Sequence, residues 1–267
     1  MNPVMTGNNP YTNTFFGIER FKIENFLKRS AHALGLRLPK LKDQKRYWND
    51  RGDHYMGLVQ EGGVLDREVF FQDLLIERLR ELDFTSAFEA GCGFGWNIRR
   101  VKEEFPHSRV GGVDFSFGQL RNARRYMEGM EKRLAMGDNR AMPFADNAFD
   151  VGFSVGVYMN IHGDDIETAL GELIRVSGKY IIQFEYDENH TTPELREARA
   201  FKTNIVSHDY AGLYGKLGQR VVDFRTFEDF GEAFRAHMEK VDTDYRLSTA
   251  FEGAEKYVMI VVEVQKP

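Results

Sequence analysis

The feature that most constrains this chain is an alternation of short apolar segments with amphipathic ones between Phe84 and Phe184. A chain that alternates in this way builds a parallel sheet whose strands are joined by crossover helices. We therefore predict an α/β fold with a seven-stranded, mostly parallel, doubly wound sheet, a helical N-terminal extension and a helical insertion before the last strand. We expect strands at residues 84–89, 109–114, 133–136, 150–155, 180–184, 220–224 and 257–264, and helices at 66–82, 96–105, 118–127, 164–176, 208–217 and 228–239.

The first 65 residues differ in character from the remainder. Residues 1–13 are polar and predict a loose tail. Between Phe15 and Leu34 apolar residues recur at roughly helical spacing, which predicts an amphipathic helix that packs on its own domain, on a second subunit of a homo-oligomer or on a membrane surface. We divide the chain into an N-terminal region, residues 1–65, and a sheet domain, residues 66–267.

Charge is concentrated at the N-terminal end. Residues 1–46 hold nine basic and three acidic side chains, a net charge of +6, and since the whole chain carries −5 the remainder carries −11. Such a balance disfavours nucleic acid as a partner of the sheet domain, whereas the basic end can bind phosphate or carboxylate groups.

Cysteine content and hydropathy indicate the cellular compartment that we expect for this chain. Cys92 is the only cysteine, so no disulfide can form within the chain. We find no uninterrupted apolar run of about eighteen residues that could cross a bilayer, and no secretory signal at the N-terminus. We expect a cytoplasmic protein without a transmembrane segment.

A glycine-rich turn follows the first expected strand. Gly91, Gly93 and Gly95 lie between that strand and the helix-like segment that begins at Trp96. Glycines let the backbone approach a ligand closely, and the next helix presents free amide groups to it. A dinucleotide-binding fingerprint has its third glycine where this chain has Trp96, so the spacing disfavours NAD.

Carboxylates stand at the ends of the next two expected strands. Asp114, 23 residues after Gly91, can accept hydrogen bonds from ribose hydroxyls. Asp138, followed by Asn139, can accept from the amino group of adenine, and Phe115 can pack against the ring. A lone aspartate at such a place is more often a helix or turn cap, so a nucleoside site is indicated only by the order of all these residues together.

A further motif, Pro143-Phe144-Ala145-Asp146, leads into the fourth expected strand. With it, the stretch from Thr85 to Glu185 resembles class I S-adenosylmethionine-dependent methyltransferases, and its four motifs occur in that family's order. The resemblance implies a Rossmann-like fold, S-adenosyl-L-methionine as cofactor and S-adenosyl-L-homocysteine as product. The cofactor-binding residues it implies are Glu89, Gly91, Gly93, Gly95, Asp114, Phe115, Asp138, Asn139 and Val155.

Methyl transfer from a sulfonium is an in-line displacement, which needs alignment and, for a hydroxyl acceptor, a base. The candidates lie on loops after the fourth and fifth strands, where α/β proteins build their sites. We expect catalytic roles for Tyr158, His162 and His208, the histidines because their ordinary pKa lies near 6.5. Each histidine can instead be a surface or capping residue.

Two other sets of residues could in principle bind a metal ion or act as a nucleophile. Glu185, Asp187 and His190 carry the ligand atoms that a divalent cation prefers, but carboxylates are common on loops, and we expect no metal. Cys92 has no base beside it in sequence to activate a thiol, so we expect a small filler of the glycine loop.

The acceptor of the methyl group is left open by the resemblance. The fourth strand ends in Gly156-Val157-Tyr158-Met159, without the Asn/Asp-Pro-Pro-aromatic turn of relatives that methylate nucleic-acid amino groups. We expect a small-molecule acceptor, methylated on oxygen or nitrogen, with sugars and secondary metabolites ahead of lipids. Residues 47–56 form either a lid or plain packing. The alternative function is a catalytically inactive binding module of the same fold.

Overall fold

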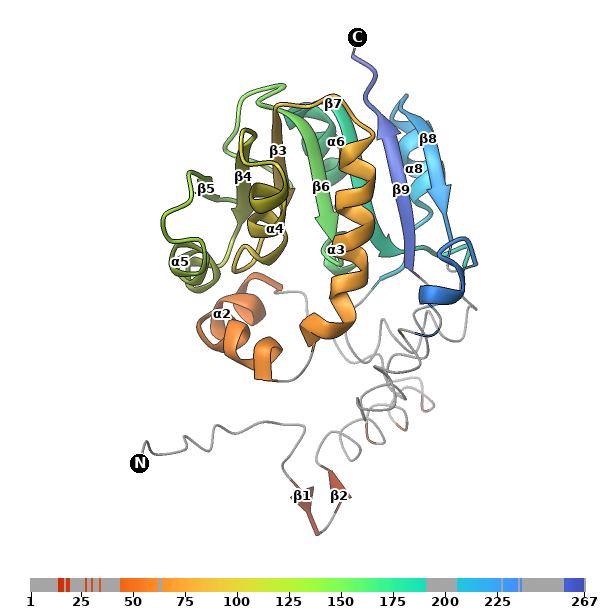
Figure 1. Cartoon of the computed structure of the whole chain (residues 1–267). Helices are drawn as coiled ribbons and strands as arrows, with labels where there is room; N and C mark the ends of the chain where they lie inside the picture. Colours follow the sequence, from red (N-terminus) through yellow and green to blue (C-terminus); the bar gives the residue numbers. More distant parts are fainter. Residues whose placement is uncertain are drawn as a thin grey trace. The chain divides into compact units, whose positions relative to one another are not determined.

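A computed structural model describes residues 14–16, 18, 19, 27, 30, 34, 44–61, 64–190, 206–226, 228–234, 236 and 257–266. The chain divides into two compact units, residues 1–42 and residues 43–267. The second unit holds the sheet domain (Figure 1).

The described part of the second unit is built on one seven-stranded sheet, as predicted (Figure 1). In it β9 alone runs opposite in direction to the other six strands. The chain passes from β3 outward to β5 and then returns to β6 on the other side of β3, so the strand order reverses between β3 and β6. Across the sheet the strands are β5 (Arg133–Met136), β4 (Arg109–Asp114), β3 (Ser86–Ala90), β6 (Phe149–Val155), β7 (Ser177–Tyr186), β9 (Tyr257–Glu263) and β8 (Arg220–Arg225).

Helices cover both faces of the sheet, as in a doubly wound fold (Figure 1). The N-terminal α2 lies beyond the carboxyl ends of β3 and β4, while α3, α4 and α5 line one face and α6 and α8 the other. Their bounds are α2 (Gln44–Glu61), α3 (Val64–Arg80), α4 (Trp96–Glu104), α5 (Phe117–Tyr126), α6 (Ile166–Val176) and α8 (Tyr210–Lys216), with a short 3-10 helix η1 (Tyr158–Asn160) after β6.

Side-chain alternation along the strands produces two apolar cores. In β9, Met259 and Val261 pack on the face covered by Leu75 of α3, whereas Ile260 packs on the opposite face with Leu173 of α6. All of these side chains are buried, and each such burial stabilises the fold by about 1.5–3 kcal/mol. The two cores fix the strands and thereby the position of their carboxyl ends, where ligands of such folds bind.

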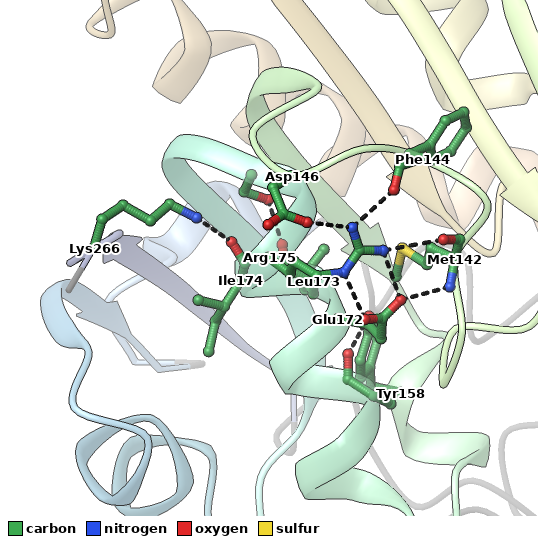
Figure 2. A network of polar contacts seen from close by, with 11 residues as sticks. Met142, Phe144, Asp146, Tyr158, Glu172, Leu173, Ile174, Arg175 and Lys266 are labelled. Atoms are coloured by element: carbon green, nitrogen blue, oxygen red, sulfur yellow. Dashed lines mark hydrogen bonds and ion pairs between the residues drawn. The ribbon is translucent and has the colours of Figure 1, made fainter.

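Figure 2 shows how the segment between β5 and β6 is held against the last turn of α6. The Arg175 guanidinium donates to the carbonyl oxygens of Met142 and Phe144, at 3.0 and 2.8 Å. It also pairs with Asp146 at 2.8 Å and Glu172 at 2.7 Å. Arg175 of α6 therefore holds the Pro-Phe-Ala-Asp motif, and with it the connection between β5 and β6, against its helix.

Of two N-terminal segments, the first keeps both of its predicted alternatives open and the second differs from expectation. Residues 47–56, predicted as a lid or plain packing, belong to the 18-residue helix α2. The helix expected from Phe15 differs at its start, where β1 (Thr14–Phe15) and β2 (Ile18–Glu19) form an antiparallel pair, with Phe16 between them at a φ of 51°. Most of the remaining residues up to Leu34 lie outside the described residues. No helix in the described part of the chain is long and apolar enough to cross a membrane.

Candidate functional site

The glycine loop after β3 adopts a backbone that requires glycine. Gly91, Gly93 and Gly95 have φ values of 76°, 51° and 82°. A Cβ on Gly91 would lie 2.4 Å from the side chain of Val157, so the first glycine also brings the turn after β6 into direct contact with the loop. The amides of Gly91 and Cys92 both donate to a carbonyl of β4, which holds the loop at the carboxyl edge of the sheet.

Glu89 lies directly before this loop and is buried. One carboxyl oxygen, Oε1, accepts a 2.7 Å hydrogen bond from Nδ2 of Asn97, while Oε2 has no hydrogen-bond partner among the described residues. Burial raises the pKa of Glu89 to about 8, and the nearby carboxyl group of Asp114 acts in the same direction. A buried carboxyl group with an unpaired oxygen is a site that favours a cationic donor.

Asp114 ends β4 and faces the glycine loop. Its two oxygens accept from the amides of Gly93 at 2.9 Å and Ser116 at 2.8 Å, and burial raises its pKa to about 6. Each oxygen of a carboxylate has two acceptor positions, so these bonds orient Asp114 without excluding hydroxyl donors. The cap of the next helix is supplied by Ser116, whose Oγ accepts from the amide of Gln119.

At the end of β5, Asp138 forms a two-pronged ion pair with Arg140, at 2.9 and 2.7 Å. Arg140 also reaches Asp165 at 2.9 Å and so links this end of the site to the start of α6. Asn139 is buried beside Asp138. The other two expected cofactor contacts, Phe115 and Val155, are half-buried at the carboxyl ends of β4 and β6.

The turn after β6 is organised by Glu185, which the sequence suggested as a metal ligand. Its buried carboxylate accepts from Ser154 Oγ at 2.8 Å and from the amides of Val157 and Met159, both at 3.1 Å. Burial raises the pKa of Glu185 to about 7. Because Val157 packs on Gly91, this carboxylate fixes the wall that the turn shares with the glycine loop.

Tyr158 and His208, two of the three expected catalytic residues, lie in the protein interior. The Tyr158 hydroxyl donates to the carbonyl of Ala169 at 3.4 Å, and burial raises its pKa well above the usual value. His208 donates from Nε2 to the carbonyl of Ile161 at 3.0 Å, and burial lowers its pKa to about 4, so its ring is neutral at pH 7. Both side chains fasten the turn after β6 to its surroundings.

His162, the third, is exposed on the loop that leads from η1 to α6. Its Nδ1 lies 3.2 Å from a carboxyl oxygen of Asp164. A carboxylate at that distance orients an imidazole ring and leaves Nε2 to face solvent or a ligand. The pKa of His208 is lowered in part by the charge of His162, so the two rings share one neighbourhood.

The suggested metal group does not form one cluster. Glu185 is committed to the turn after β6, whereas Asp187 binds Nδ1 of His190 at 2.9 Å. Among the residues that the structure describes, no group of three His, Cys, Asp or Glu side chains could hold a metal ion. Cys92 is buried, and burial raises its pKa well above the usual value, which fits the expected filler role.

Helix α2 covers the glycine loop through aromatic contacts. The rings of Trp48 and Tyr55 lie 5.3 Å apart, and Tyr55 lies 6.4 Å from Phe94 of the loop. Ser116 Oγ donates to the carbonyl of Trp48 at 3.2 Å. A Cβ on Gly52 would lie 2.2 Å from that Ser116 oxygen, so α2 crosses the start of α5 at van der Waals distance.

Two amide side chains beside the loop were missed by sequence reasoning. Asn97 and Gln119 are buried, and each has a side-chain oxygen without a hydrogen-bond partner among the described residues. Neither has a motif position that marks it in the sequence. Only their place in the helices that follow β3 and β4 brings them to the site.

The family model for a methyltransferase domain matches residues 87–179, which run from β3 into β7. That match identifies this stretch as a methyltransferase domain. The chain carries a class I, S-adenosylmethionine-dependent methyltransferase domain. The expected resemblance, fold and cofactor are confirmed at this level.

Curated relatives match this chain over part of their length. A demethylmenaquinone methyltransferase of Thermus thermophilus is 42% identical over 90 residues, 33% of this chain and 40% of the relative. A malonyl-[acyl-carrier protein] O-methyltransferase of Gallionella capsiferriformans is 28% identical over 148 residues, 51% of this chain and 49% of the relative. The chain thus spans less than half the length of these relatives.

Solved structures share the fold at low sequence identity. The magnesium protoporphyrin IX methyltransferase of Synechocystis aligns with a TM-score of 0.59 at 15% identity, over 83% of this chain and 98% of the other. A geranyl diphosphate C-methyltransferase of Streptomyces coelicolor aligns with a TM-score of 0.56 at 16% identity, over 73% and 79%. At such identities the likeness supports the fold of the methyltransferase domain.

Proposed function

We propose that this protein transfers the methyl group of S-adenosylmethionine to a small-molecule acceptor. The observation that carries the proposal is the buried Glu89, whose unpaired Oε2 lies beside the left-handed glycine loop. Asp114 adds a second, half-buried carboxyl group at the same edge of the sheet. The cofactor offers an ammonium group and two ribose hydroxyls, all hydrogen-bond donors, and these residues are acceptors, so the site fits the group.

When bound, S-adenosylmethionine supplies an electrophilic methyl group. The chain's own residues bind and orient: Asp114 accepts from the ribose hydroxyls, and Asp138 with Asn139 stands at the adenine end. Val157, held by Glu185, forms the wall between the glycine loop and the acceptor side. Alignment of this kind can supply a large part of the rate acceleration in a displacement reaction.

For the acceptor, we propose a small molecule methylated on oxygen or nitrogen, with sugar or secondary-metabolite acceptors first. The relatives are named for demethylmenaquinone and for a malonyl group on an acyl-carrier protein; the first name supports a small acceptor, and neither fixes its class. The excess of acidic residues after residue 46 supports an acceptor other than nucleic acid.

For a hydroxyl acceptor, we propose His162 as the base. It is exposed, and both the backbone amide and the carboxylate of Asp164 lie against Nδ1, at 3.4 and 3.2 Å; when Nδ1 carries its proton toward the carboxylate, Nε2 can take a proton from the acceptor. His162→Ala should lower kcat by about a hundredfold with an unchanged cofactor Kd. If the His162→Ala variant keeps the wild-type kcat, His162 is not the base.

A cofactor-binding module without catalysis is the second candidate. The observation that favours it is that Tyr158 and His208 are tied to backbone carbonyls in the interior. The two candidates separate by experiment: calorimetry with S-adenosylmethionine establishes binding, and release of S-adenosylhomocysteine is then measured with hydroxyl and amine acceptors of small size. Binding together with turnover supports the enzyme, and binding without turnover across the panel supports the module.

Most of the basic segment, residues 1–46, lies outside the described residues. We propose that its net charge of +6 attracts an acceptor that bears phosphate or carboxylate, with contact to a membrane surface as the other use of this charge. Deletion of the segment should then raise the Michaelis constant for the acceptor at low salt and have less effect at high salt. An effect of equal size at both salt concentrations would contradict this role.

A further inference from the structure

Three buried oxygens without a hydrogen-bond partner surround the glycine loop. They are Glu89 Oε2, Asn97 Oδ1 and Gln119 Oε1, on side chains that are 2%, 8% and 3% exposed. Buried acceptors in folded proteins are nearly always paired, because an unpaired one costs free energy. A ligand that brings donors to this loop would supply the missing partners.

Asn97 stands in the first turn of α4, directly after the glycine loop. Its Nδ2 donates to Glu89 Oε1 at 2.7 Å, so amide and carboxyl group form one polar unit at the end of β3. Once Glu89 is ionised, both oxygens that the unit leaves unpaired are acceptors. An ammonium group, which has three donors and no acceptor, is the functional group that matches such a unit.

Gln119 approaches the loop from the other side, in the first turns of α5. A Cβ on Gly93 would lie 3.7 Å from its Nε2. The amide of Gly93 donates to Asp114 Oδ2, so Gln119 lies at the part of the loop that faces the end of β4. Gln119 therefore shares Gly93 as a neighbour with the carboxyl group to which the proposed function assigns the ribose.

We propose that Asn97 and Gln119 are cofactor-binding residues: Asn97, together with Glu89, accepts hydrogen bonds from the ammonium group of the cofactor, and Gln119 accepts one from a ribose hydroxyl. This proposal rests on the proposed function. It assigns the two amides to different parts of one ligand, so ligands that carry only one of these parts can distinguish them.

Calorimetric titration of the full chain with two ligands tests the assignment. S-Adenosylhomocysteine carries both the ammonium group and the ribose, whereas 5′-methylthioadenosine carries the ribose without the amino-acid portion. Asn97→Ala should weaken S-adenosylhomocysteine binding by about tenfold or more and change 5′-methylthioadenosine binding by less than about twofold. Gln119→Ala should weaken both ligands to a similar extent, by about three- to tenfold.

Matched controls are available on the same helices. Glu103→Ala on α4 and Arg124→Ala on α5 alter exposed side chains and should leave both dissociation constants at wild-type values. Where Asn97→Ala lowers the melting temperature, Asn97→Ser serves as the second variant. The criterion for either is the ratio of the two dissociation constants, because partial unfolding reduces binding of both ligands alike.

The outcomes separate this proposal from the proposed function. Wild-type protein that binds neither ligand overturns both. If the wild-type protein binds both ligands, and the Asn97 variants weaken the binding of both equally or leave both unchanged, the role of Asn97 is overturned. The methyltransferase proposal then stands. The same holds for Gln119 if its replacement leaves both dissociation constants unchanged.

Discussion

Single buried side chains determine the electrostatics of the site. Glu89 is buried and Asp114 half-buried at the glycine loop, and burial raises the pKa of each, to about 8 and about 6. A cation at this loop favours the ionised forms and a neutral ligand does not. We therefore expect cofactor binding and proton release to be coupled through Glu89.

This coupling predicts a pH-dependent affinity. With its pKa at about 8, Glu89 is mainly protonated at pH 7 in the free protein, and a bound ammonium group lowers that pKa. The affinity for S-adenosylhomocysteine should rise as pH increases from 6.5 to 8, by up to about tenfold per pH unit. Calorimetry in buffers of different ionisation enthalpy should show proton release, and Glu89→Gln should abolish it. Equal release from wild type and variant would contradict the assignment.

His208 predicts a different pH effect, on stability. Burial lowers its pKa to about 4, below the value near 6.5 of an unfolded chain, so the unfolded state binds the proton more readily. Its contribution to stability is present above pH 6.5 and is lost as pH falls toward 4. The melting temperatures of wild type and His208→Gln should converge between pH 7.5 and pH 5. A difference that does not change over this range would argue against a neutral buried ring.

At the scale of elements, the helices that hold the site depend on close approach. Gly52 of α2 leaves no room for a Cβ beside Ser116, whereas a Cβ on Gly57 of the same helix would meet nothing within 4 Å. Gly52→Ala should displace α2 and, with it, Tyr55, and thereby weaken cofactor binding. Gly57→Ala is the matched control and should keep wild-type affinity and raise stability by up to about 1 kcal/mol.

Tyr55 itself tests the lid interpretation of α2. Its ring lies against both Trp48 and Phe94, so it connects the helix to the glycine loop. Tyr55→Ala should weaken cofactor or acceptor binding without unfolding the chain. If calorimetry shows unchanged binding constants for this variant, α2 only packs on the domain and is not a lid.

The connection between β5 and β6 depends on Arg175. Arg175→Ala leaves the carbonyls of Met142 and Phe144 without their donor and Glu172 without its cation (Figure 2). We expect a loss of about 2 kcal/mol in the free energy of unfolding, measured in urea, with a smaller loss for Arg175→Lys. A variant as stable as wild type would show that the motif has no such structural role.

At the scale of the whole molecule, the sheet could be predicted because its strands are apolar and its connections short. The strands at residues 109–114 and 133–136 have the predicted bounds, since their periodicity is clear and glycine or charge flanks them. Helix α2 could not be recognised, because its two glycines and many charges give it low helix propensity, and its packing on α5 stabilises it.

The candidate site, like the sheet, could be predicted in part from the sequence. Glu89 and Asp114 follow from motif spacing, because strand ends and glycine turns fix where they lie. Asn97 has no such marker, and its role depends on a contact with Glu89 that only the folded chain reveals. Tyr158 shows the opposite case, because a polar residue at the right distance after a strand can turn into the core.

The most direct test of a methyltransferase cofactor site is calorimetric titration of the full chain with S-adenosylhomocysteine. The same titration is run on the Asp114→Ala variant, and NAD is titrated into the wild-type protein as the alternative ligand. The account predicts one binding site in the wild-type protein, an affinity at least about tenfold lower in Asp114→Ala, and no binding of NAD. Absence of binding to wild type, or an affinity for NAD equal to that for S-adenosylhomocysteine, would contradict it.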